Sequence, residues 1–386
     1  MTETSSDCYI NTTASDASST RQLVADILAK ADIRINGDRP WDLQVKCENL
    51  YERVLATGNL GLGESYMDGD WEVEHLDEFF YRVLRANLQK EFKPLRLLPH
   101  ILKAKLLNRQ TTKRAWQVGE HHYDLGNDFY QAMLDPRMTY TCGYWHNANN
   151  LAEAQEAKLD LICRKLNLKP GMKVLDIGCG WGSFMGYAAE KYAVECVGVT
   201  ISKEQSTLGQ EKYRHLPVKF RLQDYRTLNE PFDHIVSIGM FEHVGHKNYR
   251  TYMEVAHRCL KKDGLFLLHT IGKNQRKSGT DPWIDKYIFP NGELPSAGQI
   301  GDSVDNLFVV EDLHNFGSDY DKTLMAWHQN FEAAWPQFKN TLGDRFYRMW
   351  RYYLLSCAGA FRARNTQLWQ WVLSKQGVPG GYQRET

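Results

Sequence analysis

Two residues with acid–base chemistry follow short apolar runs of the sequence. Glu242 lies in GMFEHVG (239–245), just after the run 234–238, and His269 ends the run 265–269. A carboxylate and an imidazole can hold or transfer a proton near neutral pH when their surroundings shift their pKa values. A lone histidine at a strand end is more often a satisfied core residue. Two polar residues at matching strand ends beside a ligand-binding turn instead indicate a reaction site.

The ligand-binding turn is KVLDIGCGWG (173–182), an apolar strand that leads into three alternating glycines, Gly178, Gly180 and Gly182. Glycines let the backbone turn sharply and approach a ligand closely. GxGxG alone is a weak signal, because dinucleotide-binding folds share it. Asp176 stands two residues before the first glycine, which resembles the first motif of class I S-adenosylmethionine methyltransferases. A carboxylate there suits the aminoacyl end or the sulfonium environment of that cofactor better than a pyrophosphate.

Two further strand ends agree with this cofactor. Gln223 and Asp224 follow the run 218–222, where such enzymes hold the adenine amino group with an acidic side chain. The run 196–199 ends at Thr200, where most of the superfamily has an acid for the ribose hydroxyls. Thr200 and Gln205 are therefore predicted to take that role, and the departure argues against a generic small-molecule methyltransferase.

Strand and helix patterns alternate from residue 151 onward, which is typical of an α/β fold. Apolar runs predict strands at 174–177, 196–199, 218–222, 234–238, 265–269, about 308–312 and 368–373. Helical patterns occupy 151–166, 183–192 and 203–213, and a loop-rich aromatic insertion (273–305) precedes aromatic helices over 323–364. The predicted fold is a seven-stranded, Rossmann-like class I methyltransferase sheet with helical and aromatic insertions.

The predicted domain order is a disordered tail (1–19), a smaller, mostly helical amino-terminal domain for lipid binding and dimerisation (20–105), a linker (106–123) and a catalytic domain (124–386). Residues 88–116 contain eight Lys and Arg against one acid. Lys103, Lys105 and Arg109 belong to a basic amphipathic pattern that can lie in an anionic lipid interface. The alternative is the solvated face of a helix packed on the next domain.

Formal net charge is zero, so attraction to an anionic partner must come from a local patch. A lipid surface is the predicted partner, and a nucleic acid is not. The eight cysteines show no CxxC pair and no zinc-site spacing, so no metal site is predicted and free thiols in a reducing cytoplasm are expected. Without a signal peptide or an apolar run of about 20 residues, the chain is expected in the cytoplasm, peripheral to the inner face of the cell membrane.

Blocks of sequence resemble, in order, the cyclopropane fatty acid synthase family over nearly the whole chain. Besides the glycine turn, MFEHVG and LLHTIG, they are GLGESYMDGDWE (61–72), EHHYDLGNDFY (120–130), DPRMTYTCGYW (135–145), PWIDKYIFPNG (282–292) and GSDYDKTLMAW (317–327). From about residue 124 the chain is also similar to the mycolic-acid cyclopropane synthases, which lack an amino-terminal domain. The resemblance implies a homodimer that transfers the methylene carbon of S-adenosylmethionine to cis double bonds of phospholipid acyl chains, forming cyclopropane rings.

The resemblance also implies a bound bicarbonate that accepts the proton lost on ring closure. It would be held by the main chain at Cys142 and Ile271 and by the side chains of Glu242, His269 and Tyr320, with Glu242 either orienting His269 or accepting the bicarbonate proton. Tyr140 and Thr141 are implied to contact the cofactor.

Methyl transfer to an alkene leaves a carbocation, so the site must exclude water and stabilise positive charge. Aromatic faces do this without acting as nucleophiles. The candidates are Tyr320, Tyr287, Phe289 and Trp283, with ordinary core packing as the alternative for each.

Two other functions use the same residues. One is a methyltransferase of this fold that acts on a soluble amine or hydroxyl acceptor, and the other is a lipid-binding protein that has lost catalysis. The basic segment and the aromatic surroundings of Glu242 disfavour the first. The intact glycine turn with Asp176, Glu242 and His269 disfavours the second.

Overall fold

The computed structural model describes residues 14–88, 125–276 and 279–385. They form two compact units, the first containing residues 14–88, 281–288 and 335–365 and the second containing the others. The predicted linker (106–123) and the basic residues Lys103, Lys105 and Arg109 lie outside the described residues. No helix in the described part of the chain has the length and the apolar composition that a membrane span requires.

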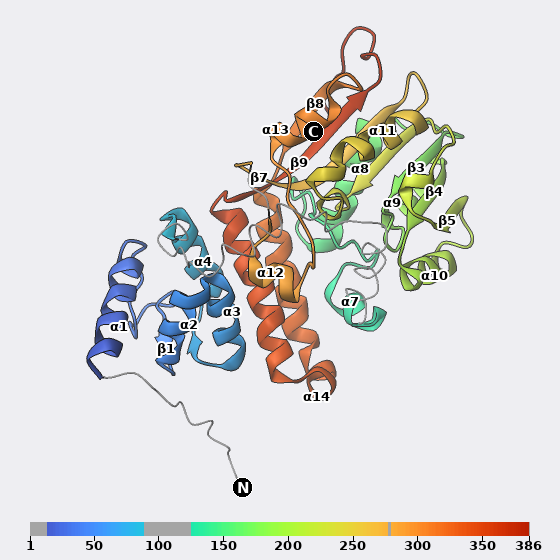
Figure 1. Cartoon of the computed structure of the whole chain (residues 1–386). Coiled ribbons are helices and arrows are strands. Elements are labelled where there is room, and N and C mark those ends of the chain that lie inside the picture. The colour runs from blue at the N-terminus through green and yellow to red at the C-terminus, as the bar shows by residue number, and fades with distance from the viewer. Residues whose placement is uncertain (1–13, 89–124, 277–278, 386) are drawn as a thin grey trace. The chain divides into compact units, whose positions relative to one another are not determined.

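Seven strands form the sheet of the second unit, in the order β5-β4-β3-β6-β7-β9-β8 (Figure 1). Strands β3 to β7 pair in parallel, and β9 runs antiparallel to both β7 and β8. The strands are β3 (Lys173–Ile177), β4 (Glu195–Thr200), β5 (Val218–Leu222), β6 (His234–Ile238), β7 (Leu265–Lys273), β8 (Val309–Asn315) and β9 (Thr366–Ser374). The predicted seven-stranded α/β fold is confirmed. Its strand order puts the carboxyl ends of β4, β3, β6 and β7 side by side.

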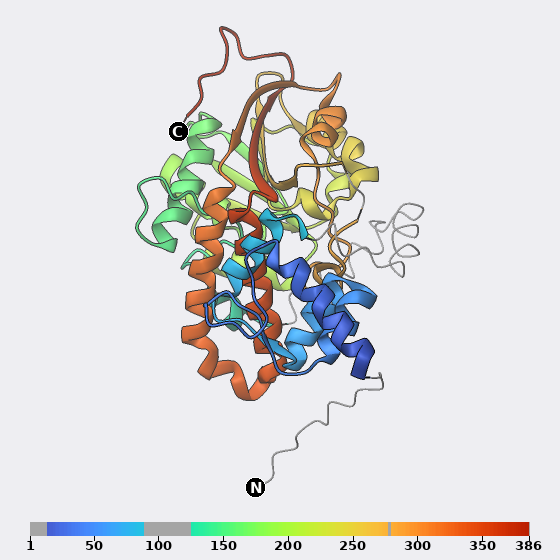
Figure 2. The same ribbon diagram turned by 90° about the vertical axis from the view of Figure 1, so that its left-hand side faces the viewer.

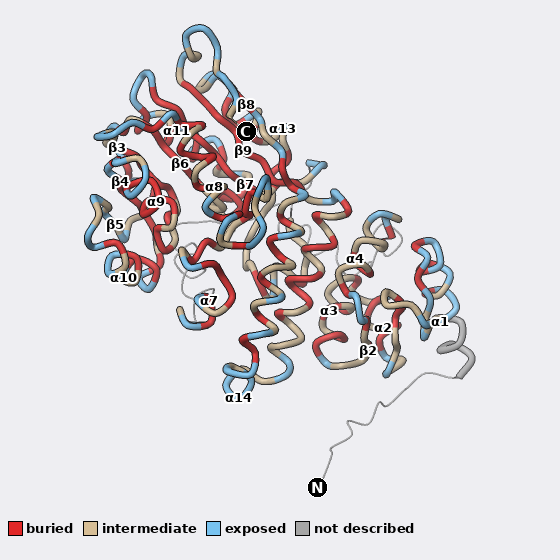
Figure 3. Tube along the Cα trace, turned by 180° about the vertical axis from the view of Figure 1, so that it is seen from behind, coloured by how far each residue is buried: buried red, intermediate tan, exposed pale blue. Residues whose placement is uncertain are grey.

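Helices cover both faces of this sheet, whose central strands are buried in Figure 3. Val174 and Val236 pack with apolar residues of α8 and α9 on one face. Leu175 and Ile235, one position along each strand, pack with α11 and α13 on the other. This alternation follows from the two-residue period of a strand. The helices of this unit include α7 (Asn127–Met133), α8 (Leu151–Lys165), α9 (Ser183–Tyr192), α10 (Lys203–Lys212), α11 (Tyr249–Cys259) and α13 (Ala297–Val304).

The first unit is mostly helical, as predicted, and has an aromatic core. Trp283 and Tyr352 lie with ring centroids 4.4 Å apart, and Tyr66 lies 5.6 Å from Tyr352. A side chain at Gly63 would meet Trp283 at 2.3 Å, so glycine permits this close packing. The elements are α1 (Ala14–Ala29), β1 (Gln44–Val45), α2 (Asn49–Thr57), α3 (Asn59–Asp68), β2 (Trp71–Glu72), α4 (Leu76–Arg85), α12 (Pro282–Tyr287) and part of α14 (Ser318–Arg362).

Helix α14 is interrupted at Gly343, whose φ of 76° is not helical. The chain reverses direction there, as the orange segment of Figure 2 shows. The two arms pack through aromatic rings, with the centroids of Trp335 and Tyr347 5.1 Å apart. Glycine suits this turn because a positive φ costs it little.

Three features differ from the sequence-based expectations. Residues 281–288 and 335–365 belong to the first unit, although 124–386 was predicted as one domain. Hydrophobic periodicity indicates local helices and strands but does not indicate which core they join.

Helix α1 begins at Ala14, inside the predicted tail of 1–19, since its alanines favour helix. Cys47 is disulfide-bonded, so the prediction of free thiols is wrong for this cysteine. Spacing along a chain does not report pairs that folding brings together.

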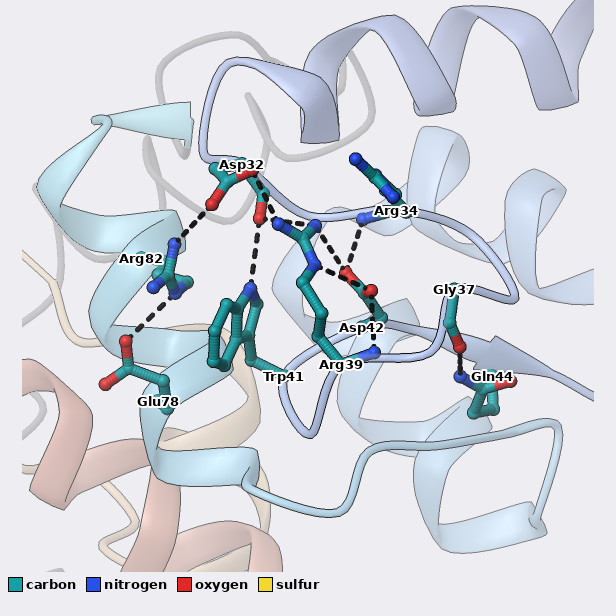
Figure 4. Close-up of polar contacts among 9 residues, drawn as sticks. All are labelled: Asp32, Arg34, Gly37, Arg39, Trp41, Asp42, Gln44, Glu78 and Arg82. Carbon is teal, nitrogen blue, oxygen red and sulfur yellow. Dashed lines mark hydrogen bonds and ion pairs between the residues drawn. The ribbon is translucent and has the colours of Figure 1, made fainter.

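Ion pairs hold the loop that follows α1 (Figure 4). The Arg39 guanidinium donates to Asp42 at 2.8 Å and to Asp32 at 2.7 Å. Arg82 donates to Asp32 at 3.0 Å and lies 4.0 Å from the centre of the Trp41 ring. Both arginines are thus already neutralised by carboxylates, so neither offers this unit an unpaired positive charge.

Candidate active site

The glycine turn joins β3 to α9 at the centre of the sheet. Gly178, Gly180 and Gly182 have φ values of 85°, 53° and 82°, which L side chains rarely adopt. A Cβ at Gly178 would lie 2.4 Å from Met240 Cγ, whereas a Cβ at Gly180 would meet nothing within 4 Å. The turn is therefore tight on its Met240 side and open at Gly180, as a ligand cradle requires.

Asp176 lies in β3, just before this turn, and one oxygen of its carboxylate lacks a hydrogen-bond donor from the residues that the structure describes. Its side chain is buried, and Oδ1 has no hydrogen-bond partner among the described residues. Burial raises the pKa of Asp176 to about 7, against the opposing effect of the Lys158 cation. A buried acceptor without a donor is costly, so a ligand that brings an amino group would satisfy it. The aminoacyl end of the predicted cofactor fits that requirement.

Cofactor binding should depend on pH through Asp176. A cationic amino group favours the ionised carboxylate, so binding must release any proton that the free protein holds. With a pKa of about 7 in the free protein, the Kd for S-adenosylmethionine is expected to be about fivefold weaker at pH 6 than at pH 7, a range in which the amino group stays cationic. Isothermal titration calorimetry measures this, and Asp176→Asn should remove the dependence. A flat wild-type profile would contradict the assignment.

Two residues of α8 that sequence patterns did not single out hold Thr141 in place by hydrogen bonds. Lys158, fully buried on α8, donates from Nζ to Thr141 Oγ1 at 2.8 Å, and Gln155 Nε2 donates to the Thr141 carbonyl at 2.7 Å. Burial lowers the pKa of Lys158 to about 8, although Asp135, Cys142 and Asp176 raise it. The available signal was a lysine on the apolar face of the helix predicted at 151–166.

The predicted adenosine-binding residues lie at the ends of β4 and β5. The Thr200 hydroxyl donates to Gln205 Oε1 at 3.2 Å, and the Gln223 N–H donates to the Thr200 carbonyl at 3.0 Å. Asp224 accepts from the main chain of Arg226 at 3.0 Å and pairs with its guanidinium at 3.1 Å. These oxygens sit one and two strands from the glycine turn, where hydroxyl and amino groups of a nucleoside could be bound.

Glu242 lies in a single turn of 3-10 helix (Phe241–His243) just after β6. Its Oε1 accepts a hydrogen bond from the Ile271 N–H at 2.6 Å, while Oε2 is buried with no partner in the described part of the chain. Burial raises the pKa of Glu242 to about 7, and the Ile271 N–H opposes this. The carboxylate is thus held by the main chain of β7, and of the Ile271 main chain, which was expected to contact bicarbonate, the N–H is bonded to Glu242.

His269 reaches the same sheet edge from β7. It pairs in register with Ile238 of β6, and its carbonyl accepts from the Gly239 N–H at 2.9 Å. The ring is buried, and within the described residues Nε2 has no hydrogen-bond partner. Burial, with the cations of Lys158 and Lys165, lowers the pKa of His269 well below its usual value, so the imidazole is neutral. The predicted adjacency of these two strand ends is confirmed.

Cys142 and its neighbours lie against the same strand ends. A Cβ at Gly239 would meet Thr141 Cγ2 at 2.5 Å, which puts Thr141 directly on the end of β6. The Gly143 N–H donates to the Thr323 hydroxyl of α14 at 3.0 Å. Burial raises the pKa of the Cys142 thiol well above its ordinary value, which agrees with the expectation that it is not a nucleophile.

Aromatic rings join Tyr140 to Tyr320. The Trp327 ring lies 5.1 Å from that of Tyr140 and 6.0 Å from that of Tyr320, measured between centroids. Trp327 is fully buried, and no partner for its Nε1 occurs among the described residues. It lies in the GSDYDKTLMAW block, but periodicity could not distinguish it from core packing.

The other predicted aromatic residues divide between the two units. Phe289 belongs to the second unit, where its ring lies 6.0 Å from that of His243. Tyr287 and Trp283 belong to the first unit, where Tyr287 donates to Glu64 at 2.8 Å and Trp283 packs in the core. For Trp283 the contacts are those of the core-packing alternative. Lys103, Lys105 and Arg109 are beyond the described residues.

The chain is similar to known proteins over most of its length. The sequence profile of the family described as mycolic acid cyclopropane synthetase matches residues 110–371. The chain is 56% identical over 367 residues to the cyclopropane-fatty-acyl-phospholipid synthase of Escherichia coli (strain K12), covering 93% of this chain and 94% of that protein. It is 38% identical over 273 residues to cyclopropane mycolic acid synthase 3 of Mycobacterium tuberculosis (strain ATCC 25618 / H37Rv), covering 66% of this chain and 95% of that one.

A solved structure of a mycolic acid cyclopropane synthase also superposes on this chain. The mycolic acid cyclopropane synthase CmaA1, complexed with SAH and CTAB, superposes with a TM-score of 0.64 at 36% identity. The match covers 67% of this chain and 98% of that one. Because nearly all of CmaA1 is matched by two thirds of this chain, the remaining third is additional to that fold.

Proposed function

Because the chain belongs to the mycolic acid cyclopropane synthetase family, we propose that it transfers the methylene carbon of S-adenosylmethionine to cis double bonds of unsaturated acyl chains in membrane phospholipids, forming cyclopropane rings. The observation that carries this proposal is the pair of unpartnered, buried atoms Glu242 Oε2 and His269 Nε2 at neighbouring strand ends. Buried atoms that can hold or share a proton suit a reaction that must lose a proton without admitting water.

The residues supply binding, orientation and water exclusion. S-Adenosylmethionine supplies an electrophilic methyl group, and the unsatisfied Asp176 Oδ1 and the open glycine turn fit its aminoacyl end. When the alkene forms a bond to that carbon and the S–C bond breaks, positive charge develops on the acyl chain. The contacts among the rings of Tyr140, Tyr320 and Trp327 support a role for them in stabilising that charge without trapping it. Loss of a proton from the added methyl then closes the ring.

A bound bicarbonate would supply a weak base for that proton. The residues that would hold it are the side chains of Glu242, His269 and Tyr320 and the main chain at Cys142 and Ile271. Its fit is supported by the two unpartnered buried atoms, of which one can donate and one can accept or share a proton. Since the Ile271 N–H is bonded to Glu242, the contribution expected of Ile271 is its carbonyl.

The test is incubation with S-adenosylmethionine and vesicles of an unsaturated phospholipid, followed by mass spectrometry of the acyl chains. A gain of one CH2 with loss of the alkene supports the proposal. Methylation of the headgroup or of an added soluble amine would favour the alternative methyltransferase, and no cofactor turnover would favour a lipid-binding protein. Pelleting the same vesicles tests the proposed peripheral attachment at the cytoplasmic face, and sedimentation velocity tests the proposed homodimer.

A further inference from the structure

A buried glutamine faces the imidazole of the site. His269 of β7 and Gln370 of β9 lie directly opposite one another in the antiparallel pairing of the two strands. Opposite residues of such a pair put their side chains on the same face of the sheet. Both residues are buried, with exposed fractions of 1% and 0%, and Gln370 Nε2 lies 3.3 Å from His269 Nδ1. Nothing in the sequence pairs these residues, which are far apart along the chain.

The chemistry of the two groups sets the direction of this hydrogen bond. In the structure the amide nitrogen of Gln370 faces the ring, and because an amide nitrogen carries hydrogens and no accepting lone pair, Nδ1 accepts in this orientation. A neutral imidazole that accepts at Nδ1 carries its proton on Nε2. The ring is kept neutral by burial and by the ammonium groups of Lys158 and Lys165, both of which are fully buried. A second proton on the ring would lie in the field of two cations.

We propose that Gln370 is a positioning residue that holds His269 in the tautomer with its proton on Nε2. His269 then donates a hydrogen bond from Nε2 and cannot itself act as the base. What this Nε2–H group binds rests on the proposed function. The group suits an oxyanion of the carboxylate or carbonate class bound beside Glu242. The proton lost on ring closure must accordingly go to such an anion or to Glu242 and not to the imidazole.

Two substitutions separate positioning from packing. Gln370→Met keeps the length of the side chain and removes its hydrogen-bond donors. Gln370→Glu replaces the amide with a carboxylate, which the nearby cations keep ionised. A carboxylate can only accept a hydrogen bond, so His269 must then carry a proton on Nδ1. The matched control is Gln367→Met, a second buried glutamine of β9, whose amide bonds to Asn274 and Asn315 and not to His269. It lies three positions away and therefore on the other face of the strand.

The readout is the protonation of the His269 ring nitrogens, followed by NMR in the full-length, cofactor-free protein labelled with 15N-histidine and assigned with His269→Gln. We expect an unprotonated Nδ1 in the wild type and in Gln367→Met, and a protonated Nδ1 in Gln370→Glu. Turnover should fall by about 10- to 100-fold in Gln370→Met, with the Kd for S-adenosylmethionine unchanged within about twofold. Gln367→Met should turn over like the wild type.

A protonated Nδ1 in the wild type would overturn the inference, and so would an Nδ1 that stays unprotonated in Gln370→Glu. Equal turnover in Gln370→Met and the wild type would overturn the positioning role. If a Gln370 variant fails to fold, the wild-type measurement still decides the tautomer. Because the NMR readout needs no lipid, a wild type that has the expected tautomer but forms no cyclopropane would contradict the proposed function and leave this inference standing.

Discussion

Replacing Glu242 with glutamine is expected to lower turnover on phospholipid vesicles by about 100-fold or more, while the Kd for S-adenosylmethionine stays within about twofold. The amide oxygen of glutamine can still accept from the Ile271 N–H, the bond that Glu242 Oε1 makes at 2.6 Å, so the local geometry should survive. At the position of Oε2, however, an NH2 donor would replace an unpartnered acceptor. Single-turnover kinetics and calorimetry on the same protein measure both quantities.

A matched control for this substitution is Glu230→Gln. Glu230 is also a carboxylate of the second unit, but it is partly exposed and ion-paired with Lys173 at 3.2 Å and with Arg221. Its loss should leave turnover unchanged, because neither of its partners belongs to the candidate site. Equal losses of turnover and cofactor affinity in Glu242→Gln would mean that Glu242 belongs to the cofactor site instead.

The parts of this site that depend on local sequence could be predicted. Strand β5, strand β6 and helix α9 have the predicted bounds, because a buried strand and an amphipathic helix each produce a pattern within a few residues. The glycine turn was equally clear, since the φ of 85° at position 178 costs glycine little and costs other residues more. The parallel order of the sheet then places Glu242 and His269 together without further information.

Contacts between distant segments could not be predicted. Lys158 and Gln155 hold Thr141 through bonds from α8, and on the sequence they are two polar residues on an apolar helix face. Gln370 meets His269 only because β9 inserts antiparallel beside β7. Likewise, Ile271 bonds Glu242 because β7 continues four residues beyond the predicted end at 269. Each contact depends on register between strands or helices, which hydrophobic periodicity leaves open.

Gly178→Ala is expected to weaken S-adenosylmethionine binding by about 10- to 100-fold. Alanine at a positive φ costs about 1–2 kcal/mol, and the turn has φ of 85° at this position. The new methyl group would also lie 2.4 Å from Met240 Cγ, so Met240 or the turn must move. Either movement disturbs the cradle, because each tenfold loss of affinity needs only about 1.4 kcal/mol. Calorimetry gives the Kd, and thermal unfolding gives the change in stability.

Gly171→Ala separates the backbone cost of alanine at a positive φ from the overlap of the new methyl group with Met240. Gly171 has a similar φ of 80°, and a Cβ there would meet nothing within 4 Å. It lies in the exposed turn before β3, so its substitution carries the same backbone cost without the overlap and should lower stability while leaving the Kd unchanged. If Gly178→Ala loses stability like Gly171→Ala but binds the cofactor normally, the glycine at 178 serves only the turn. A loss of affinity confined to Gly178→Ala means that the contact with Met240 keeps the cradle in its binding shape.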